Sequence, residues 1–163
     1  MKHIQIIISL LILYGLGTLI FTGRDKGVVD KKSGEFFDGW TKQIGTSSDD
    51  LGNSVTTDSS GNIYLTGTTK GGLDGNTSSG ESDIFLVKYN SSGTKQWTKQ
   101  MGTSSIDLGI GVTTDSSGNI YVTGFSKGGL DGNTSSRKSD IFLVKYNSSG
   151  TKQWTKQLGT SSS

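Results

Sequence analysis

The sequence of 163 residues contains no cysteine, no proline and a single histidine, His3. Without cysteine the chain can form neither a disulfide framework nor a thiolate zinc site. His3 lies at the edge of an N-terminal apolar segment. The rest of the chain therefore lacks the histidine that a Ser-His-Asp triad, a Cys-His pair or a His-ligated transition metal requires. These absences exclude all three kinds of site from residues 4–163.

A strong excess of charge is also missing. The formal net charge is +2, and the lysines are spread through the chain rather than gathered in a block. Nucleic-acid-binding proteins usually carry a basic patch, so this distribution predicts no nucleic-acid partner. Apolar residues make up 30% of the chain, and the 25 glycines stand with Ser, Thr and Asn between short apolar runs. This composition is typical of an all-β protein with many turns.

Residues 1–23 have the composition of an export signal. Lys2 and His3 precede an apolar run of 18 residues at 4–21, within which Gly15 and Gly17 offer a cleavage site of small residues. The alternative is an uncleaved anchor, because a helix needs ~20 apolar residues to span a bilayer. Both alternatives predict a hydrophobic leader helix that contacts the membrane and an exported remainder, whether periplasmic, surface-bound or secreted. Residues 24–36 show neither strand nor helix periodicity, and we predict a linker there.

The rest of the chain is built on a repeat of 57 residues. The first copy occupies residues 41–97 and the second occupies 98–154, with 48 of the 57 positions identical. Trp40, Trp97 and Trp154 mark the period, and a third copy begins at Thr155. Repeats of this length are supersecondary units that bury their apolar faces by stacking on one another.

Each copy contains four strand-like runs bounded by turn residues. In the first copy these are Asn53–Asp58, Asn62–Thr68, Asp83–Tyr89 and Thr94–Met101, and in the second Ile110–Asp115, Asn119–Phe125, Asp140–Tyr146 and Thr151–Leu158. Short Asx/Gly turns join the first run to the second and the third to the fourth, as hairpins require. The copies therefore predict antiparallel sheets of four strands.

The third and fourth runs predict how these sheets are placed. Asp83–Tyr89 is apolar on both faces, so it must be covered on both sides, which a radial array of four-stranded blades provides. The fourth run carries several lysines around Trp97, and charge of this kind suits an outer edge strand. We therefore interpret Trp40, Trp97 and Trp154 as packing anchors at the rim of each blade.

The runs DSSGNIYLTG, SDIFLVKYNSSGTKQW and TKQIGTSS resemble the bacterial SBBP β-propeller repeat. The resemblance extends from Trp40 to Gly159 and recurs twice in register. It implies four-stranded propeller blades in an exported or surface protein, mostly without a defined activity, and it carries over no catalytic residue. We expect a partial propeller over residues 37–163, with blades at about 53–101 and 110–158 and an extra outer strand at 37–44.

Two blades are fewer than a closed propeller requires, since closure takes about 4–8. Apolar residues such as Ile84, Phe85, Ile141 and Phe142 would then lack neighbours on one side, and exposed apolar area drives association. We therefore expect self-association or further blades, the chain being either part of a longer propeller or a unit that closes a ring with other copies.

The long connections between strands should share one edge of the array, where binding sites usually lie. Most differences between the copies fall in or beside these connections, which indicates either an interaction face for a protein or glycan or simple drift in tolerant loops. The candidate residues are Asp49, Asp50, Lys70, Asp74, Asn76, Glu81, Ile106, Asp107, Phe125, Lys127, Asp131, Asn133, Arg137 and Lys138.

Two further functions are weaker alternatives. The loop GGLDGNTSS, at residues 71–79 and 128–136, offers oxygen ligands for calcium, but its spacing fits no known calcium loop and turn chemistry explains its residues. A carboxylate pair for glycoside hydrolysis would have to come from Asp50, Asp58, Asp74 or Asp83. All four recur in both copies, whereas an acid and a base need different environments. We therefore predict no enzymatic activity and no cofactor.

Overall fold

The computed structural model describes residues 28–29, 36–37, 40–136 and 138–160, which belong to two compact units, Met1–Trp40 and Thr41–Ser163. In the first unit, β1 (Val28–Val29) pairs antiparallel with β2 (Phe36–Phe37). The predicted leader and most of the predicted linker lie outside the described residues. Within the described ranges no helix is long and apolar enough to cross a membrane.

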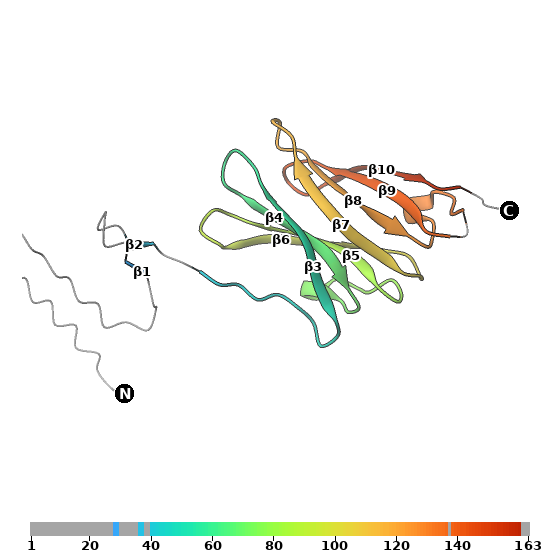
Figure 1. The fold of residues 1–163 in the computed structure, drawn as a ribbon, viewed down its shortest axis with the longest axis horizontal. Helices are drawn as coiled ribbons and strands as arrows, with labels where there is room; N and C mark the ends of the chain where they lie inside the picture. The colour runs from blue at the N-terminus through green and yellow to red at the C-terminus, as the bar shows by residue number, and fades with distance from the viewer. Residues whose placement is uncertain (1–27, 30–35, 38–39, 137, 161–163) are drawn as a thin grey trace, which may run out of the picture. The chain divides into compact units, whose positions relative to one another are not determined.

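The second unit consists of two four-stranded antiparallel sheets, as the repeat predicts (Figure 1). Blade 1 contains β3 (Asp50–Thr57), β4 (Ile63–Thr69), β5 (Asp83–Tyr89) and β6 (Lys95–Met101), and blade 2 contains β7 (Asp107–Thr114), β8 (Ile120–Ser126), β9 (Asp140–Tyr146) and β10 (Lys152–Leu158). In each blade the strands lie side by side in chain order. The prediction of propeller-type blades is confirmed.

The predicted bounds are accurate for three strands of each blade and too short for the first. The first strand begins at Asp50 in blade 1, three residues before the predicted start, and at Asp107 in blade 2. A bulge between Gly52 and Ser54 separates the early part of β3 from the rest. Because glycine interrupts the apolar alternation there, the early part of the strand carries no recognisable strand pattern.

The predicted extra strand at residues 37–44 is wrong for the part that the structure describes. Phe37 ends β2, and residues 40–44 are not in any strand. In the repeat this segment corresponds to β6, which pairs with the third strand of its own blade, and no such third strand precedes residue 37 among the described residues. Ile44 packs instead on one face of blade 1, against a cluster that includes Phe85 and Val87.

Each blade has two apolar faces, because alternate residues of a strand point to opposite sides. We define the forward face of blade 1 by Tyr64, Ile84 and Leu86, and its rear face by Phe85 and Val87. The forward and rear faces of blade 2 carry the residues 57 positions later.

The forward face of blade 1 packs on the rear face of blade 2. Their residues form one buried cluster, made of Tyr64, Ile84, Leu86, Ile120, Val122, Leu130, Phe142, Val144 and Tyr146. Fully burying a side chain such as Leu or Ile contributes about 1.5–3 kcal/mol. This cluster is larger than the second one, which consists of Leu73, Phe85, Val87 and Tyr89 on the rear face of blade 1, so the junction between the blades contains the larger core.

The tight turn between the first two strands follows from its sequence. The carboxylate of Asp58 accepts hydrogen bonds from the backbone N–H groups of Ser60 and Asn62 and from the hydroxyl of Tyr64. Gly61 takes a φ of 76°, which is costly for other residues. Burial opposes ionisation of Asp58, but these hydrogen bonds outweigh it and lower its pKa. Asp115 accepts the equivalent bonds in blade 2.

Candidate interaction surface

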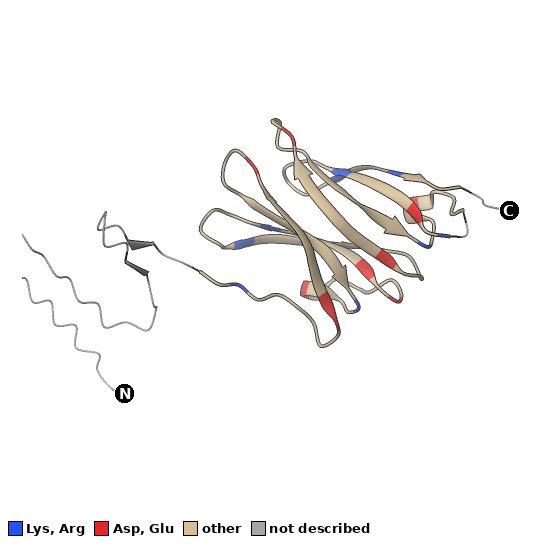
Figure 2. Cartoon of the chain, in the orientation of Figure 1, with Lys and Arg blue, Asp and Glu red and all other residues tan. Residues whose placement is uncertain are grey.

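The long connections of both blades emerge at one edge of the unit, and the tight turns emerge at the opposite edge (Figure 1). Strands β3, β5, β7 and β9 all start at the long-connection edge, and each starts with an aspartate (Figure 2). The up-and-down strand order requires this arrangement. It brings most of the candidate residues to the same edge, as the sequence predicts.

Blade 1 presents both signs of charge at this edge. Lys70 donates to the carboxylate of Asp49 at 2.8 Å, and both side chains are well exposed. The hydrogen bond from Lys70 to Asp49 raises the pKa of the lysine. Glu81, in the following connection, is also exposed. Exposed ion pairs contribute little to stability, so these charges are available to a partner at small cost.

Blade 2 presents a basic surface at the equivalent positions. Ile106 stands where blade 1 has Asp49, so the carboxylate that pairs with Lys70 has no counterpart beside Lys127. The backbone N–H of Lys127 still donates to the carbonyl of Ile106 at 3.0 Å, which keeps the loop geometry unchanged. Lys138 replaces Glu81 and is exposed. Its neighbour Arg137 lies outside the described residues.

Asp107 is wrong as a candidate for an exposed surface. Its side chain is 0% exposed and accepts hydrogen bonds from Thr103 and from the hydroxyl of Ser126. Asp50 is half-buried and accepts the equivalent bonds from the N–H and hydroxyl of Thr46. Because the first strand begins earlier than predicted, both aspartates lie inside the sheet end, where they hold the connection that enters each blade.

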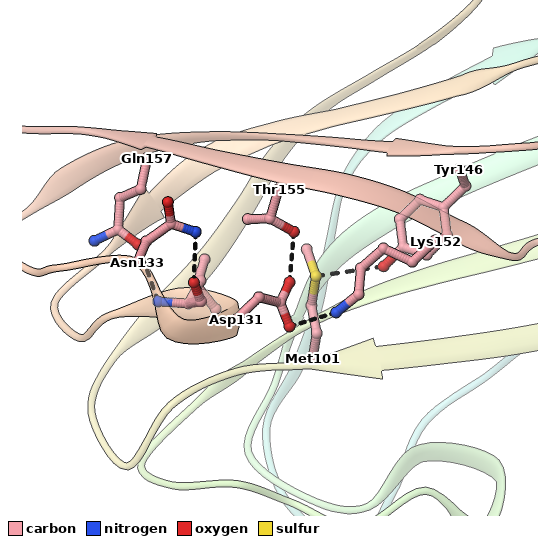
Figure 3. A network of polar contacts seen from close by, with 8 residues as sticks. Met101, Asp131, Asn133, Tyr146, Lys152, Thr155 and Gln157 are labelled. Atoms are coloured by element: carbon pink, nitrogen blue, oxygen red, sulfur yellow. Dashed lines mark hydrogen bonds and ion pairs between the residues drawn. The ribbon is translucent and has the colours of Figure 1, made fainter.

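Asp131 and its counterpart Asp74 are engaged within their own blades. Asp131 accepts hydrogen bonds from Lys152 and Thr155 of β10 (Figure 3). Asp74 accepts them from Lys95, at 2.5 Å, and from Thr98. Burial opposes ionisation of both aspartates, but these bonds outweigh it and lower both pKa values.

These contacts turn the loop GGLDGNTSS back onto its blade. The loop contains a short 3₁₀ turn, η1 (Leu73–Gly75) in blade 1 and η2 (Leu130–Gly132) in blade 2. Leu73 and Leu130 are buried in the two cores. Gln157 accepts from the backbone N–H of Leu130 at 2.9 Å (Figure 3). It also donates to the carbonyl of Gly128 at 2.9 Å. The loop thus covers the rear face of its blade.

Asn76 and Asn133 stabilise the same loops. Each side-chain amide donates to the carbonyl three residues earlier at 2.7 Å. A calcium ion at these loops would have to replace the hydrogen bonds of Asp74 and Asp131 with metal bonds. Among the residues that the structure describes, no group of three or more His, Cys, Asp or Glu is close enough to hold a metal.

Phe125 lies at the forward face of blade 2 rather than in a connection. It is half-buried in β8 and faces Ile141 across the strand pair. Leu143, which the sequence reasoning did not single out, lies on the same face and is exposed. Conversely, Phe85 and Phe142, which were expected to lack neighbours, are buried. Phe85 is covered by Leu73 of the GGLDGNTSS loop and by Ile44, and Phe142 is covered by Leu130 and by the forward face of blade 1. No strand pattern reveals the loop contacts.

The three tryptophans differ in how far they are packed. Trp97 packs against the larger core, next to Tyr64 at a ring-centroid distance of 6.2 Å. Gly150, in the last tight turn of blade 2, lies directly against the indole of Trp97, and a Cβ there would stand 2.8 Å from the ring. Trp154 lies next to Tyr121, the counterpart of Tyr64 in blade 2, but it is more exposed than Trp97. Trp40 is exposed.

Comparisons with known proteins agree with the fold. The β-propeller repeat of the SBBP family matches residues 39–74 and 96–131. The second match begins within β6 and ends within η2, so the sequence repeat crosses the junction between the blades. The matched unit therefore contains the outer edge of one blade and the first two strands of the next.

Two curated relatives are similar over most of the chain. An uncharacterized WD repeat-containing protein of Acanthamoeba polyphaga mimivirus is 27% identical over 161 residues, which covers 75% of this chain and 12% of the relative. The regulatory protein FlaEY of Caulobacter vibrioides is 29% identical over 117 residues, which covers 63% of this chain and 12% of the relative. The chain thus spans a small part of the length of both proteins.

Proposed function

The chain carries two β-propeller repeats of the SBBP family, and from this premise we propose that it is an exported, non-enzymatic protein that binds a protein or glycan through its long-connection edge. The observation that carries the proposal is the contrast in charge along this edge. The connections of blade 1 carry Asp49, Lys70 and Glu81, whereas the equivalent positions of blade 2 are Ile106, Lys127 and Lys138, with Arg137 preceding Lys138 in the sequence.

The contrast lies on a scaffold that is otherwise the same in both blades. The 48 identical positions include the tight turns and most of the buried residues. Loops on a rigid scaffold are the usual place for recognition. An acidic or sulfated glycan, or an acidic protein segment, would fit the basic end of the edge, because complementary charge steers association and fixes orientation.

The absence of enzymatic activity belongs to the same proposal. Asp58 is held by its turn, Asp74 by Lys95 and Thr98, and Asp50 by Thr46. A general acid or base needs a carboxylate that is open to substrate and has an environment of its own. Neither relative is named as an enzyme. Hydrolysis of a polysaccharide by the purified chain would contradict this part of the proposal.

The second candidate is a purely structural repeat without a ligand, which the near-identity of the blades favours. A binding screen against glycans and proteins of the cell exterior separates the two. Substituting Lys127→Glu together with Lys138→Glu should lower the affinity for an acidic ligand by about tenfold or more, because like charges then face each other. The matched variant Lys70→Glu, in blade 1, should have a smaller effect. Binding that both variants leave unchanged would contradict the role of this edge, and an empty screen would favour the structural candidate.

A further inference from the structure

The forward face of blade 2 is an uncovered copy of a buried surface. Ile84 is 1% exposed in blade 1, and its counterpart Ile141 is 63% exposed. Leu86 is 2% exposed, and Leu143 is 40% exposed. At the end of β10, Leu158 is 74% exposed. Apolar side chains gathered in this way on one sheet face mark an interaction site.

The junction inside the chain shows which surface fits this face. The forward face of blade 1 is covered by a rear face, that of blade 2, through Ile120, Val122 and Val144. Three of the four strands of blade 1 lie against the first strand of blade 2, β7. The cover for a forward face is therefore the rear face of a blade with this sequence.

The polar contacts of the junction fix its orientation. The hydroxyl of Tyr146 donates to the sulfur of Met101 at 3.3 Å, and the hydroxyl of Thr114 donates to the carbonyl of Thr57 at 3.2 Å. The backbone N–H of Asp107 donates to the carbonyl of Ser82 at 3.0 Å. These contacts lie along the whole length of the strands, so they define one direction and one register of docking.

The chain carries a second rear face, on blade 1, which is only partly covered. Val55 is 63% exposed, whereas its counterpart Val112 packs into the junction. A pocket of about 390 Å³ lies on this side of blade 1, lined among others by Tyr89 and Gly93. Their counterparts, Tyr146 and Gly150, contact Met101 and Trp97 inside the junction.

From this correspondence we infer that a second copy of the chain docks head-to-tail, its blade 1 rear face covering the blade 2 forward face of the first copy. In this arrangement Trp154 and Leu158 of one copy enter the pocket beside Tyr89 and Gly93 of the next. The two docking surfaces differ from each other, so the contact is heterologous and can close into a ring. With two blades per chain, closure at about 4–8 blades takes two to four copies.

The intermolecular junction should be weaker than the internal one. The side-chain amide of Asn53 donates to the carbonyl of Gly109 at 2.6 Å, and the backbone N–H of Val112 donates to the hydroxyl of Ser54 at 3.3 Å. In blade 2, Ile110 stands in place of Asn53 and Gly111 in place of Ser54. Neither has a polar side chain, so neither hydrogen bond can recur between copies. Association should therefore depend on concentration in a measurable range.

One segment of the chain already occupies part of the rear face. Ile44 packs there against Phe85 and Val87, and it occupies the repeat position of Met101 and Leu158. Leu158 of a second copy must displace it. The variant Ile44→Ser should therefore strengthen association by several-fold, because the segment then competes less well for the face.

Single cysteines test the orientation, since the chain has no cysteine of its own. The variants Thr57→Cys and Thr114→Cys of the full chain, each purified in mild detergent, are treated with a short bis-maleimide, separately and as a mixture. Head-to-tail docking places Thr114 of one copy beside Thr57 of the next. We expect a crosslinked species of twice the 17.2 kDa chain mass in the mixture and several-fold less in either variant alone.

A surface variant tests the face itself by light scattering after size-exclusion chromatography. The wild type should run as two to four copies, and Leu143→Lys should lower its association by at least about tenfold, because the interface would bury an unpaired charge. The matched variant Ser117→Lys, on a tight turn, should associate as the wild type does. Unchanged circular dichroism for both variants excludes misfolding.

Three outcomes would overturn the inference. A wild type that stays monomeric at a chain concentration of about 100 μM would mean that the forward face of blade 2 is left open or is covered within the chain. An oligomer with equal crosslinking in mixed and unmixed samples would indicate another docking orientation. An oligomer that Leu143→Lys leaves intact would place the contact on a different surface.

Discussion

Blade 1 and blade 2 are built from nearly the same sequence, yet they bury it to different extents. On the forward faces, Ile84, Leu86 and Thr66 are buried, while Ile141, Leu143 and Thr123 are exposed. The strands, their register and their turns are the same in both blades. The difference therefore comes only from the neighbour, since blade 2 covers blade 1 and no described residue covers blade 2 in turn.

The rear faces differ in the opposite sense. Val122 is fully buried in blade 2, and its counterpart Leu65 in blade 1 is only half-buried. The loop residues Leu73 and Leu130 cover both rear faces, but blade 2 also receives the forward face of blade 1. Each blade of this repeat thus has apolar surface for two neighbouring blades, and in the described residues each blade packs against one other blade.

The largest effect should come from removing the same side chain at the two positions. Leu86→Ala should lower the free energy of unfolding by about 2–5 kcal/mol, because it leaves a cavity in the junction. Leu143→Ala, at the equivalent but exposed position of β9, should cost less than about 1 kcal/mol in the monomer. Urea titration followed by tryptophan fluorescence measures both. Equal costs would mean that the two forward faces are equally covered.

A smaller effect should separate the two strand-leading aspartates. Asp107→Ala leaves the N–H and hydroxyl of Thr103 without their acceptor, at a cost of about 1–3 kcal/mol, whereas the hydroxyl of Ser126 keeps the carbonyl of Gly128. Asp50→Ala should cost less, because Asp50 is half-buried and its donors can reach water. The same titration gives both values. The reverse order would contradict the tighter environment of Asp107.

Acid should weaken both blades through their turn aspartates. Asp58 and Asp115 have pKa values below the ordinary 3.8. A carboxyl group with a depressed folded-state pKa stabilises the fold above its unfolded pKa and loses that contribution as the pH falls toward the folded value. The urea concentration at half-unfolding should therefore decrease as the pH is lowered below about 4. The decrease should be less steep in the double variant Asp58→Asn and Asp115→Asn. A midpoint independent of pH between 5 and 2 (roughly the window over which carboxylates titrate) would contradict this contribution.

The smallest effect should be that of the exposed ion pair. Lys70→Ala removes the partner of Asp49 in blade 1, and Lys127→Ala removes a lysine that has no such carboxylate in blade 2. Exposed pairs are screened by water and salt, so neither variant should shift the urea midpoint measurably. A clear loss for Lys70→Ala alone would show that the pair holds the long connection of blade 1.

Most of the fold could be predicted from the sequence, because turn chemistry is local. The run from Asp58 to Asn62 makes its own hydrogen bonds, and the apolar pattern of Asp83–Tyr89 predicts a strand covered on both sides. Local signals failed where a tertiary contact decides the outcome. Gln157 and Thr155 hold the GGLDGNTSS loop from a strand more than twenty residues away in the sequence, and no pattern within the loop announces that contact.

The candidate surface was predicted in part. The common edge of the long connections follows from the number and order of the strands, and it is where the structure places Asp49, Lys70 and Lys127. Asp107 was assigned to the surface because it stands beside loop residues. Its burial depends on the bulge that lets the strand start earlier.

The repeat by itself determined the strands, the tight turns and the alternation of apolar side chains, because these depend on residues close in sequence. It could not determine which apolar faces are buried, since both copies carry the same residues. Only the stacking of one blade on the other decided that Ile84 lies in a core and Ile141 on a surface. The physical reason is that burial is a property of the pair of surfaces in contact, and a sequence describes one of them at a time.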